Sequence, residues 1–164
     1  MRIYLIGLPG VGKTTIGKMI AEKLNFNFYD TDDLIFKTVG EMPKDIINNK
    51  GEAYFREIET AILKSTLNLP KGIISCGGGI VEKQENQEFI KGLIVYLKAD
   101  PHQLSFSDNE IKSRPLLEAS GIVDLYEKRK NKYLDFSNLV IDVTNKSNEM
   151  VADEVIKSYE NFNN

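Results

Sequence analysis

The chain has 164 residues, of which 41% are hydrophobic and 27% charged, and its formal net charge is -3. These values predict one ordinary globular domain, and they argue against a protein dedicated to nucleic acid or membrane surfaces, which would carry clustered basic residues. The only cysteine, Cys76, excludes an intramolecular disulfide, argues against a cysteine-based metal site and fits a reducing compartment. We therefore expect one cytoplasmic domain over residues 1–164, without a membrane span.

The N-terminal part of the chain predicts strand, loop, helix, strand and helix in that order. Apolar residues at 3–6 form a short run, and a glycine-rich loop separates them from apolar residues at helical spacing over 16–24. Residues 26–29 are rich in aromatics and predict a second strand, which runs into acidic residues before a helical pattern over 34–39. The acidic residues therefore lie where a strand meets a helix.

Two helices are predicted next. Pro43 suits the first turn of a short helix, and Gly51 ends it. The longer helix that follows has an apolar stripe made of Phe55, Ile58, Ile62 and Leu63. Arg56 and Glu59 lie off this stripe, one turn apart.

The remaining elements complete an α/β pattern. We expect strands at 72–75, 93–97 and 139–143, a helix near 84–91, a charged helix over 125–133 and an apolar-periodic helix at the end of the chain. Five apolar strands alternating with helices predict a parallel sheet covered on both faces, with right-handed crossovers. Ligands of such folds bind beyond the carboxyl ends of the strands.

The glycine-rich loop matches a phosphate-binding pattern. Residues 7–14 read G-x-x-x-x-G-K-T and lie between the first strand and helix, as the mechanism requires. Glycines let backbone N–H groups surround phosphate oxygens, while Lys13 reaches the terminal phosphates and Thr14 can ligate Mg²⁺. The alternative is a glycine turn that only caps a helix. The full pattern in this context favours nucleotide binding.

Two missing signatures narrow the function. The stretch 145–148 reads Asn-Lys-Ser-Asn and lacks the aspartate of a guanine-binding signature, and the third strand ends in Ser75 rather than in an Mg²⁺-binding aspartate. Asp30 and Asp32 could supply that charge, one toward Mg²⁺ and one toward an acceptor hydroxyl. The alternative for both is helix capping, and Asp33 is interpreted as a residue of the first helical turn.

Three arginines and a glycine run remain. Taken singly, Arg56, Arg114 and Arg129 are each most simply solvated surface charges. The run Gly77–Gly79 follows a strand and allows a small ligand to approach the backbone closely, although it is also compatible with a flexible turn. His102 has no motif around it and is interpreted as an exposed residue.

The sequence resembles the shikimate kinases over essentially its whole length. Five motifs follow the order of that family: GLPGVGKTT at 7–15, Asp-x-Asp at 30–32, GEAYFREIE at 51–59, three glycines at 77–79, and RPLL at 114–117 followed by the Arg129-to-Tyr133 spacing. The first motif is generic, but the other four together are specific.

The resemblance implies phosphorylation of the 3-hydroxyl of shikimate by ATP, with Mg²⁺, on the route to aromatic amino acids. It also implies the three-layer fold of the nucleoside monophosphate kinases, with strand order 2-3-1-4-5, substrate-binding helices at about 31–64 and a mobile lid at about 105–114. Shikimate and ATP would be the only partners of a monomer that binds neither nucleic acid nor membrane.

The resemblance also implies residue roles. ATP would be bound by Gly10, Val11, Gly12, Lys13, Thr14, Thr15, Arg114 and Lys146. Shikimate would be bound by Asp32, Arg56, Gly77, Gly78, Gly79 and Arg129, with Glu59 orienting Arg56. Thr14 would ligate Mg²⁺, with Asp30 assisting through water. Lys13, Asp32 and Arg114 would be catalytic, with Asp32 deprotonating the hydroxyl and Arg114 approaching the transferred group as the lid closes.

Two positions depart from the family pattern. Ser107 stands near the place of a lid arginine, leaving Lys112 as the only cation of the segment 105–112, and Ile47 replaces an aromatic residue, so that Phe55 alone forms one wall for shikimate. Two alternatives therefore stay open. The chain could be a related kinase for gluconate or a nucleoside monophosphate, or an inactive nucleotide-binding regulatory module.

Overall fold

The computed structural model describes residues 1–164 and has one five-stranded parallel sheet with the order β2-β3-β1-β4-β5. The strands are β1 (Arg2–Ile6), β2 (Asn27–Asp30), β3 (Gly72–Ser75), β4 (Gly92–Lys98) and β5 (Leu139–Asp142). The predicted α/β class and strand order are confirmed, and each strand lies within one residue of its predicted bounds.

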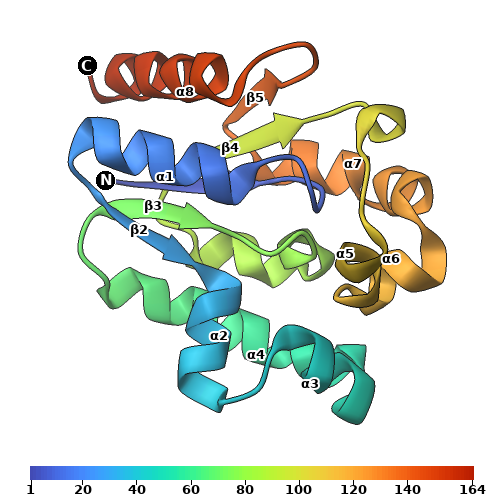
Figure 1. Ribbon diagram of the computed structural model, residues 1–164. Coiled ribbons are helices and arrows are strands. Elements are labelled where there is room, and N and C mark those ends of the chain that lie inside the picture. The colour runs from blue at the N-terminus through green and yellow to red at the C-terminus, as the bar shows by residue number, and fades with distance from the viewer.

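Eight α-helices surround the sheet. They are α1 (Lys13–Leu24), α2 (Thr31–Val39), α3 (Pro43–Lys50), α4 (Glu52–Ser65), α5 (Asp108–Lys112), α6 (Pro115–Ser120), α7 (Ile122–Phe136) and α8 (Asn148–Asn163). Helices α1 and α8 cover one face, whereas the end of α4 and helix α7 cover the other. Figure 1 shows α2 and α3 beyond the sheet, next to α4. None of the helices combines the length and apolarity that a membrane crossing requires.

Strand β1 illustrates why the central strands are continuously apolar. Ile3 and Leu5 point into the cluster under α1 and α8, while Tyr4 and Ile6 point into the cluster under α4 and α7. All four are fully buried, because successive side chains of a strand alternate between two covered faces. The edge strands β2 and β5 keep partly exposed residues.

The helix predicted near 84–91 is present, but it is a short 3-10 helix and not an α-helix. The chain forms two 3-10 helices here, Ile80–Glu82 and Gln84–Phe89. The buried Asn86 explains the tight path, since its Oδ1 accepts a hydrogen bond from Thr60 Oγ1 at 2.7 Å and its Nδ2 donates to the Ile80 carbonyl at 2.8 Å. Both polar groups of this buried side chain therefore have hydrogen-bond partners.

Helices α2, α3 and α4 share a small apolar cluster of their own. It contains Ile35, Ile46, Phe55 and Ile62, all buried and separate from the two clusters against the sheet. Pro43 occupies the first turn of α3, and Gly51 ends that helix with a φ of 87°. Helix α4 contacts α2, which follows β2, and the 3-10 helix Ile80–Glu82, which follows β3, so it lies toward the carboxyl ends of these strands, where parallel sheets bind ligands.

Candidate active site

The glycine-rich loop lies between β1 and α1 and holds Lys13 at the start of the helix. The ammonium Nζ of Lys13 donates to the carbonyls of Gly7 at 2.8 Å and Leu8 at 2.7 Å. Burial lowers the pKa of Lys13 to about 8, although the neighbouring Asp32 raises it. The loop therefore holds a buried cation at the N-terminus of a helix, where anions are stabilised.

A pocket beside this loop, which we call the phosphate pocket, collects most of the predicted nucleotide-binding residues. Its walls are Pro9, Gly10, Gly12, Lys13, Thr14, Thr15, Asp30, Asp32, Ser75, Cys76, Gly77, Gly78 and Arg114. Val11 is buried outside it. Lys146 is also outside the walls, and its Nζ lies 2.8 Å from Glu154 Oε2 on α8. For Val11 and Lys146, ATP binding therefore stays a prediction.

Asp30 combines the two interpretations that the sequence left open. Its Oδ1 accepts a hydrogen bond from the Asp32 backbone N–H at 2.9 Å and so caps α2. Its Oδ2 accepts from Thr14 Oγ1 at 3.1 Å. Asp30 and Thr14 thus present adjacent oxygen atoms to the phosphate pocket.

Asp32 lies in the first turn of α2 and faces both the phosphate pocket and a second pocket. Removal from water and the neighbouring Asp30 carboxylate raise the pKa of Asp32 to about 6, against the opposing effect of Lys13. A carboxylate with a pKa near neutrality is suited to accept a proton from a hydroxyl.

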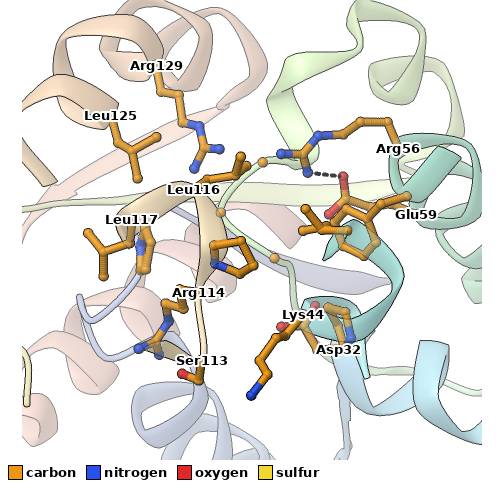
Figure 2. A pocket seen from close by; sticks show the side chains of 18 residues that line it. Asp32, Lys44, Arg56, Glu59, Ser113, Arg114, Leu116, Leu117, Leu125 and Arg129 are labelled. Atoms are coloured by element: carbon orange, nitrogen blue, oxygen red, sulfur yellow. Dashed lines mark hydrogen bonds and ion pairs between the residues drawn. The ribbon is translucent and has the colours of Figure 1, made fainter. Parts of the chain in front are cut away.

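The second pocket, which we call the acceptor pocket, is lined by 18 residues. Figure 2 shows Arg56 from α4 and Arg129 from α7 entering it from different sides, with Asp32 and Arg114 at its other end. Ile47 and Phe55 form part of its apolar wall. The two pockets share Pro9, Asp32, Gly77, Gly78 and Arg114.

Arg56 is held by two carboxylates of its own helix. Its Nη1 donates to Glu59 Oε1 at 2.9 Å, and its Nη2 donates to Glu52 Oε1 at 3.2 Å. Arg56 is only 6% exposed and Glu59 only 1%, so the interpretation of Arg56 as a solvated charge is wrong. Burial raises the pKa of Glu59 in spite of Arg56. Glu59 orients the guanidinium, and both residues lie off the apolar stripe because they face the pocket.

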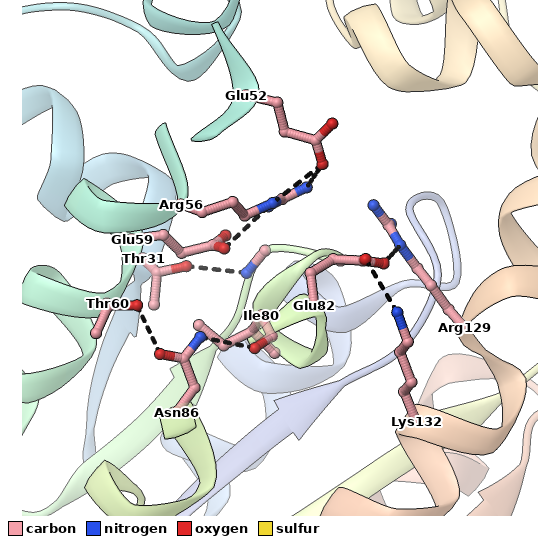
Figure 3. A network of polar contacts seen from close by, with 12 residues as sticks. Thr31, Glu52, Arg56, Glu59, Thr60, Ile80, Glu82, Asn86, Arg129 and Lys132 are labelled. Atoms are coloured by element: carbon pink, nitrogen blue, oxygen red, sulfur yellow. Dashed lines mark hydrogen bonds and ion pairs between the residues drawn. The ribbon is translucent and has the colours of Figure 1, made fainter. Parts of the chain in front are cut away.

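Arg129 is held in a similar way from the other side. Its Nε donates to Glu82 Oε1 at 2.8 Å, and Lys132 approaches the other oxygen of Glu82 at 3.2 Å, as Figure 3 shows. Arg129 is 4% exposed and is not a solvated charge either. Sequence reasoning missed Glu82, because no pattern links residues so far apart in the chain. The bond through Nε leaves the terminal nitrogens of Arg129 available to a ligand.

The glycine run is anchored rather than flexible. The Gly77 N–H donates to Thr31 Oγ1 at 2.9 Å, and the Tyr133 hydroxyl donates to the Gly78 carbonyl at 2.6 Å. A Cβ atom on Gly79 would overlap the Arg56 guanidinium. The run therefore packs against the arginine of the acceptor pocket, and Thr31 is a further contributor that the sequence did not indicate.

The segment after β4 carries Arg114, which precedes α6 and lines both pockets. Its Nη1 donates to the Glu110 carbonyl at 3.4 Å. Lys112 is exposed and lines neither pocket, whereas Lys44, which sequence reasoning missed, stands at the mouth of the acceptor pocket. Figure 2 shows the Lys44 ammonium between Ser113 and Asp32. His102 is exposed, as expected.

Comparisons with known proteins agree on one family. The family model described as shikimate kinase matches residues 9–160. A shikimate kinase of Caldanaerobacter subterraneus is 39% identical over 96% of this chain and 95% of its own length. The solved shikimate kinase of Acinetobacter baumannii in complex with shikimate is 30% identical, with a TM-score of 0.87 over 95% of this chain and 90% of that one. A gluconokinase of Sinorhizobium meliloti, covering 98% of this chain and 94% of its own, shares only the fold, with a TM-score of 0.58 and 16% identity.

Proposed function

The chain belongs to the shikimate kinase family, and from this premise we propose how its residues transfer the γ-phosphoryl group of ATP to the 3-hydroxyl of shikimate. One observation carries the proposal: a phosphate pocket and an arginine-lined pocket meet at Asp32 and Arg114. A carboxylate and a guanidinium at the junction of two pockets are what a transfer between a donor and a hydroxyl acceptor requires.

The acceptor pocket suits a small hydroxylated carboxylate. Arg56 and Arg129 supply forked donors to the carboxylate of shikimate, and their partners, the buried Glu59 and the half-buried Glu82, fix the direction of the guanidinium groups. The Gly78 N–H and Asp32 bind the hydroxyls on the other side of the ring. Phe55 and Ile47 contact its apolar part.

The transfer itself needs a base and positively charged groups around the phosphates. Asp32 accepts the proton of the 3-hydroxyl, and the oxygen forms a bond to the γ-phosphorus as the bond from that phosphorus to the bridging oxygen of ADP breaks. Lys13 and the amides of the loop stabilise the charge on the β- and γ-phosphates. Arg114 faces the group in transfer.

The oxygen atoms near the loop fit Mg²⁺. Thr14 Oγ1 and Asp30 Oδ2 lie side by side at the phosphate pocket, and hard oxygen donors are those that Mg²⁺ prefers. No cluster of three His, Cys, Asp or Glu side chains surrounds them. Thr14 would ligate the ion and Asp30 would hold its water, with phosphate oxygens completing the shell. When bound, Mg²⁺ neutralises charge on the phosphates.

The proposal extends to the state of the protein. The residues assigned to both substrates lie in one chain, so transfer requires no residue of a second copy, and we propose a monomer. The single cysteine together with the need for ATP supports a cytoplasmic location.

The direct test measures ADP release with ATP and Mg²⁺, comparing shikimate with gluconate, a panel of nucleoside monophosphates and no acceptor. We expect release with shikimate alone, with shikimate 3-phosphate identified as the product. Release with a different acceptor would replace the substrate assignment while keeping the kinase. ATP binding without transfer to any acceptor would instead support a regulatory module.

A glycine substitution tests the acceptor pocket. Gly79→Ala places a methyl group where the Arg56 guanidinium lies, and because Glu52 and Glu59 hold that guanidinium, it must leave its position. We expect the KM for shikimate to rise about 10-fold while the KM for ATP stays unchanged. In an Arg56→Ala background the methyl group should have no further effect, and an equal effect in both backgrounds would contradict the assignment.

A further inference from the structure

The position where the family pattern expects a lid arginine has a structural role in this chain. Ser107 caps α5, because its Oγ accepts a hydrogen bond from the Glu110 N–H at 3.2 Å while the Ser107 N–H donates to Glu110 Oε1 at 3.1 Å. This reciprocal pair fixes the start of the helix. Ser107 therefore supplies no cation to the site. The neighbouring residue, Phe106, makes different contacts.

That residue, Phe106, rests on the phosphate loop. A Cβ atom placed on Gly10 would lie 2.5 Å from Phe106 Cε1 and 2.8 Å from its Cζ, closer than real atoms approach. Phe106 is half-buried and also packs against the apolar cluster under α7. It does not line the phosphate pocket. The ring thus lies against the loop from outside the space that the phosphates would occupy.

The same ring lies next to Arg114. The guanidinium carbon is 5.8 Å from the centre of the Phe106 ring, within the range of a cation–π contact. The other contacts of this guanidinium are weak, namely the 3.4 Å bond to the Glu110 carbonyl and a 3.8 Å approach to the Glu110 carboxylate. Phe106 therefore lies against both the phosphate loop and Arg114.

We propose that Phe106 is a positioning residue for phosphoryl transfer: its ring keeps the Arg114 guanidinium in a fixed position relative to the phosphate loop. The inference rests on the proposed function, because it matters only if Arg114 faces the group in transfer. A small displacement of a charged group at a transfer site is costly. A packed aromatic ring limits such displacement without touching either substrate.

Three variants test this role. Phe106→Leu keeps the apolar bulk but removes the ring, whereas Phe106→Tyr keeps the ring. Phe89→Leu is a matched control, since Phe89 is also half-buried, lies beneath Lys64 at 4.3 Å and is outside both pockets. We expect Phe106→Leu to lower kcat about 10-fold and to raise the share of ATP hydrolysed without transfer. Phe106→Tyr and Phe89→Leu should stay within about 2-fold of wild type.

A double substitution separates positioning from simple packing. In an Arg114→Met background, Phe106→Leu should change kcat by less than about 2-fold, because its target is gone. Additive effects, an unchanged kcat in Phe106→Leu, or an equal loss in Phe89→Leu would overturn the proposal. Wild-type transfer to an acceptor other than shikimate would overturn the proposed function alone. The kcat of the variants is then measured with that acceptor. A wild type without any transfer would overturn both.

Discussion

Replacing Asp32 with asparagine is expected to lower kcat by about 10²–10⁴ while leaving ATP binding nearly intact. The amide keeps the shape of the side chain and can still face the acceptor hydroxyl, but it cannot accept the proton. Asp32 is the only carboxylate that lines both pockets. The other carboxylate of the acceptor pocket, Glu59, is engaged by Arg56. Steady-state kinetics together with ATP binding by calorimetry measure both effects.

The pH dependence provides an independent check on Asp32. Its pKa is raised to about 6, so the wild-type kcat should fall as the pH drops below that value, since the protonated acid is no longer a base. Asp32→Asn should lack this acidic limb. The exposed neighbour Asp33 offers a matched control, and Asp33→Asn should retain both the rate and the limb. Turnover of Asp32→Asn at the wild-type rate would remove Asp32 from the role of base.

Arg129→Ala is expected to weaken shikimate binding by about 2–5 kcal/mol, or roughly 30- to 5,000-fold. Arg129 is buried and fixed by Glu82, so its loss leaves the carboxylate of shikimate and that of Glu82 without their common partner. The dissociation constant for shikimate, measured by titration calorimetry, reports the change. The affinity for ATP should be unaffected because Arg129 does not line the phosphate pocket.

Lys132 is the control for this experiment. It contacts the same glutamate, but its side chain is 43% exposed and it does not line the acceptor pocket. Lys132→Ala should change shikimate binding by less than about 2-fold, as is typical of exposed ion pairs. Arg129→Lys, which keeps the charge but loses the fork, should fall between wild type and Arg129→Ala. Shikimate affinity that survives Arg129→Ala would return Arg129 to a purely structural role.

The sheet could be predicted from the sequence because a strand buried on both faces is a continuous apolar run, as Ile3–Ile6 illustrates. The 3-10 geometry of the helix near 84–91 could not be predicted, because Asn86 in this helix bonds to Thr60 in another element. Local patterns also could not decide whether Asp30 caps a helix or serves the site. The two oxygens of one carboxylate do both.

The site was predictable where a residue belongs to a compact motif and not where its role depends on a distant partner. Lys13 and Asp32 follow from their motifs, whereas the pairing of Glu82 with Arg129 and the contact of Phe106 with Gly10 arise only when remote segments meet. The arginines show the same limit. As isolated charges they cannot be told from surface residues, and only the structure shows that Arg56 and Arg129 are buried, each beside a carboxylate.

The separate apolar cluster of α2, α3 and α4 has an evolutionary consequence. Ile35, Ile46, Phe55 and Ile62 pack with one another and not with the two clusters that support the sheet and the phosphate loop. These helices carry Lys44, Phe55 and Arg56 of the acceptor pocket, none of which lines the phosphate pocket. One wall of the acceptor pocket can therefore change shape through substitutions in these three helices, while Arg129 on α7 keeps the opposite wall in place.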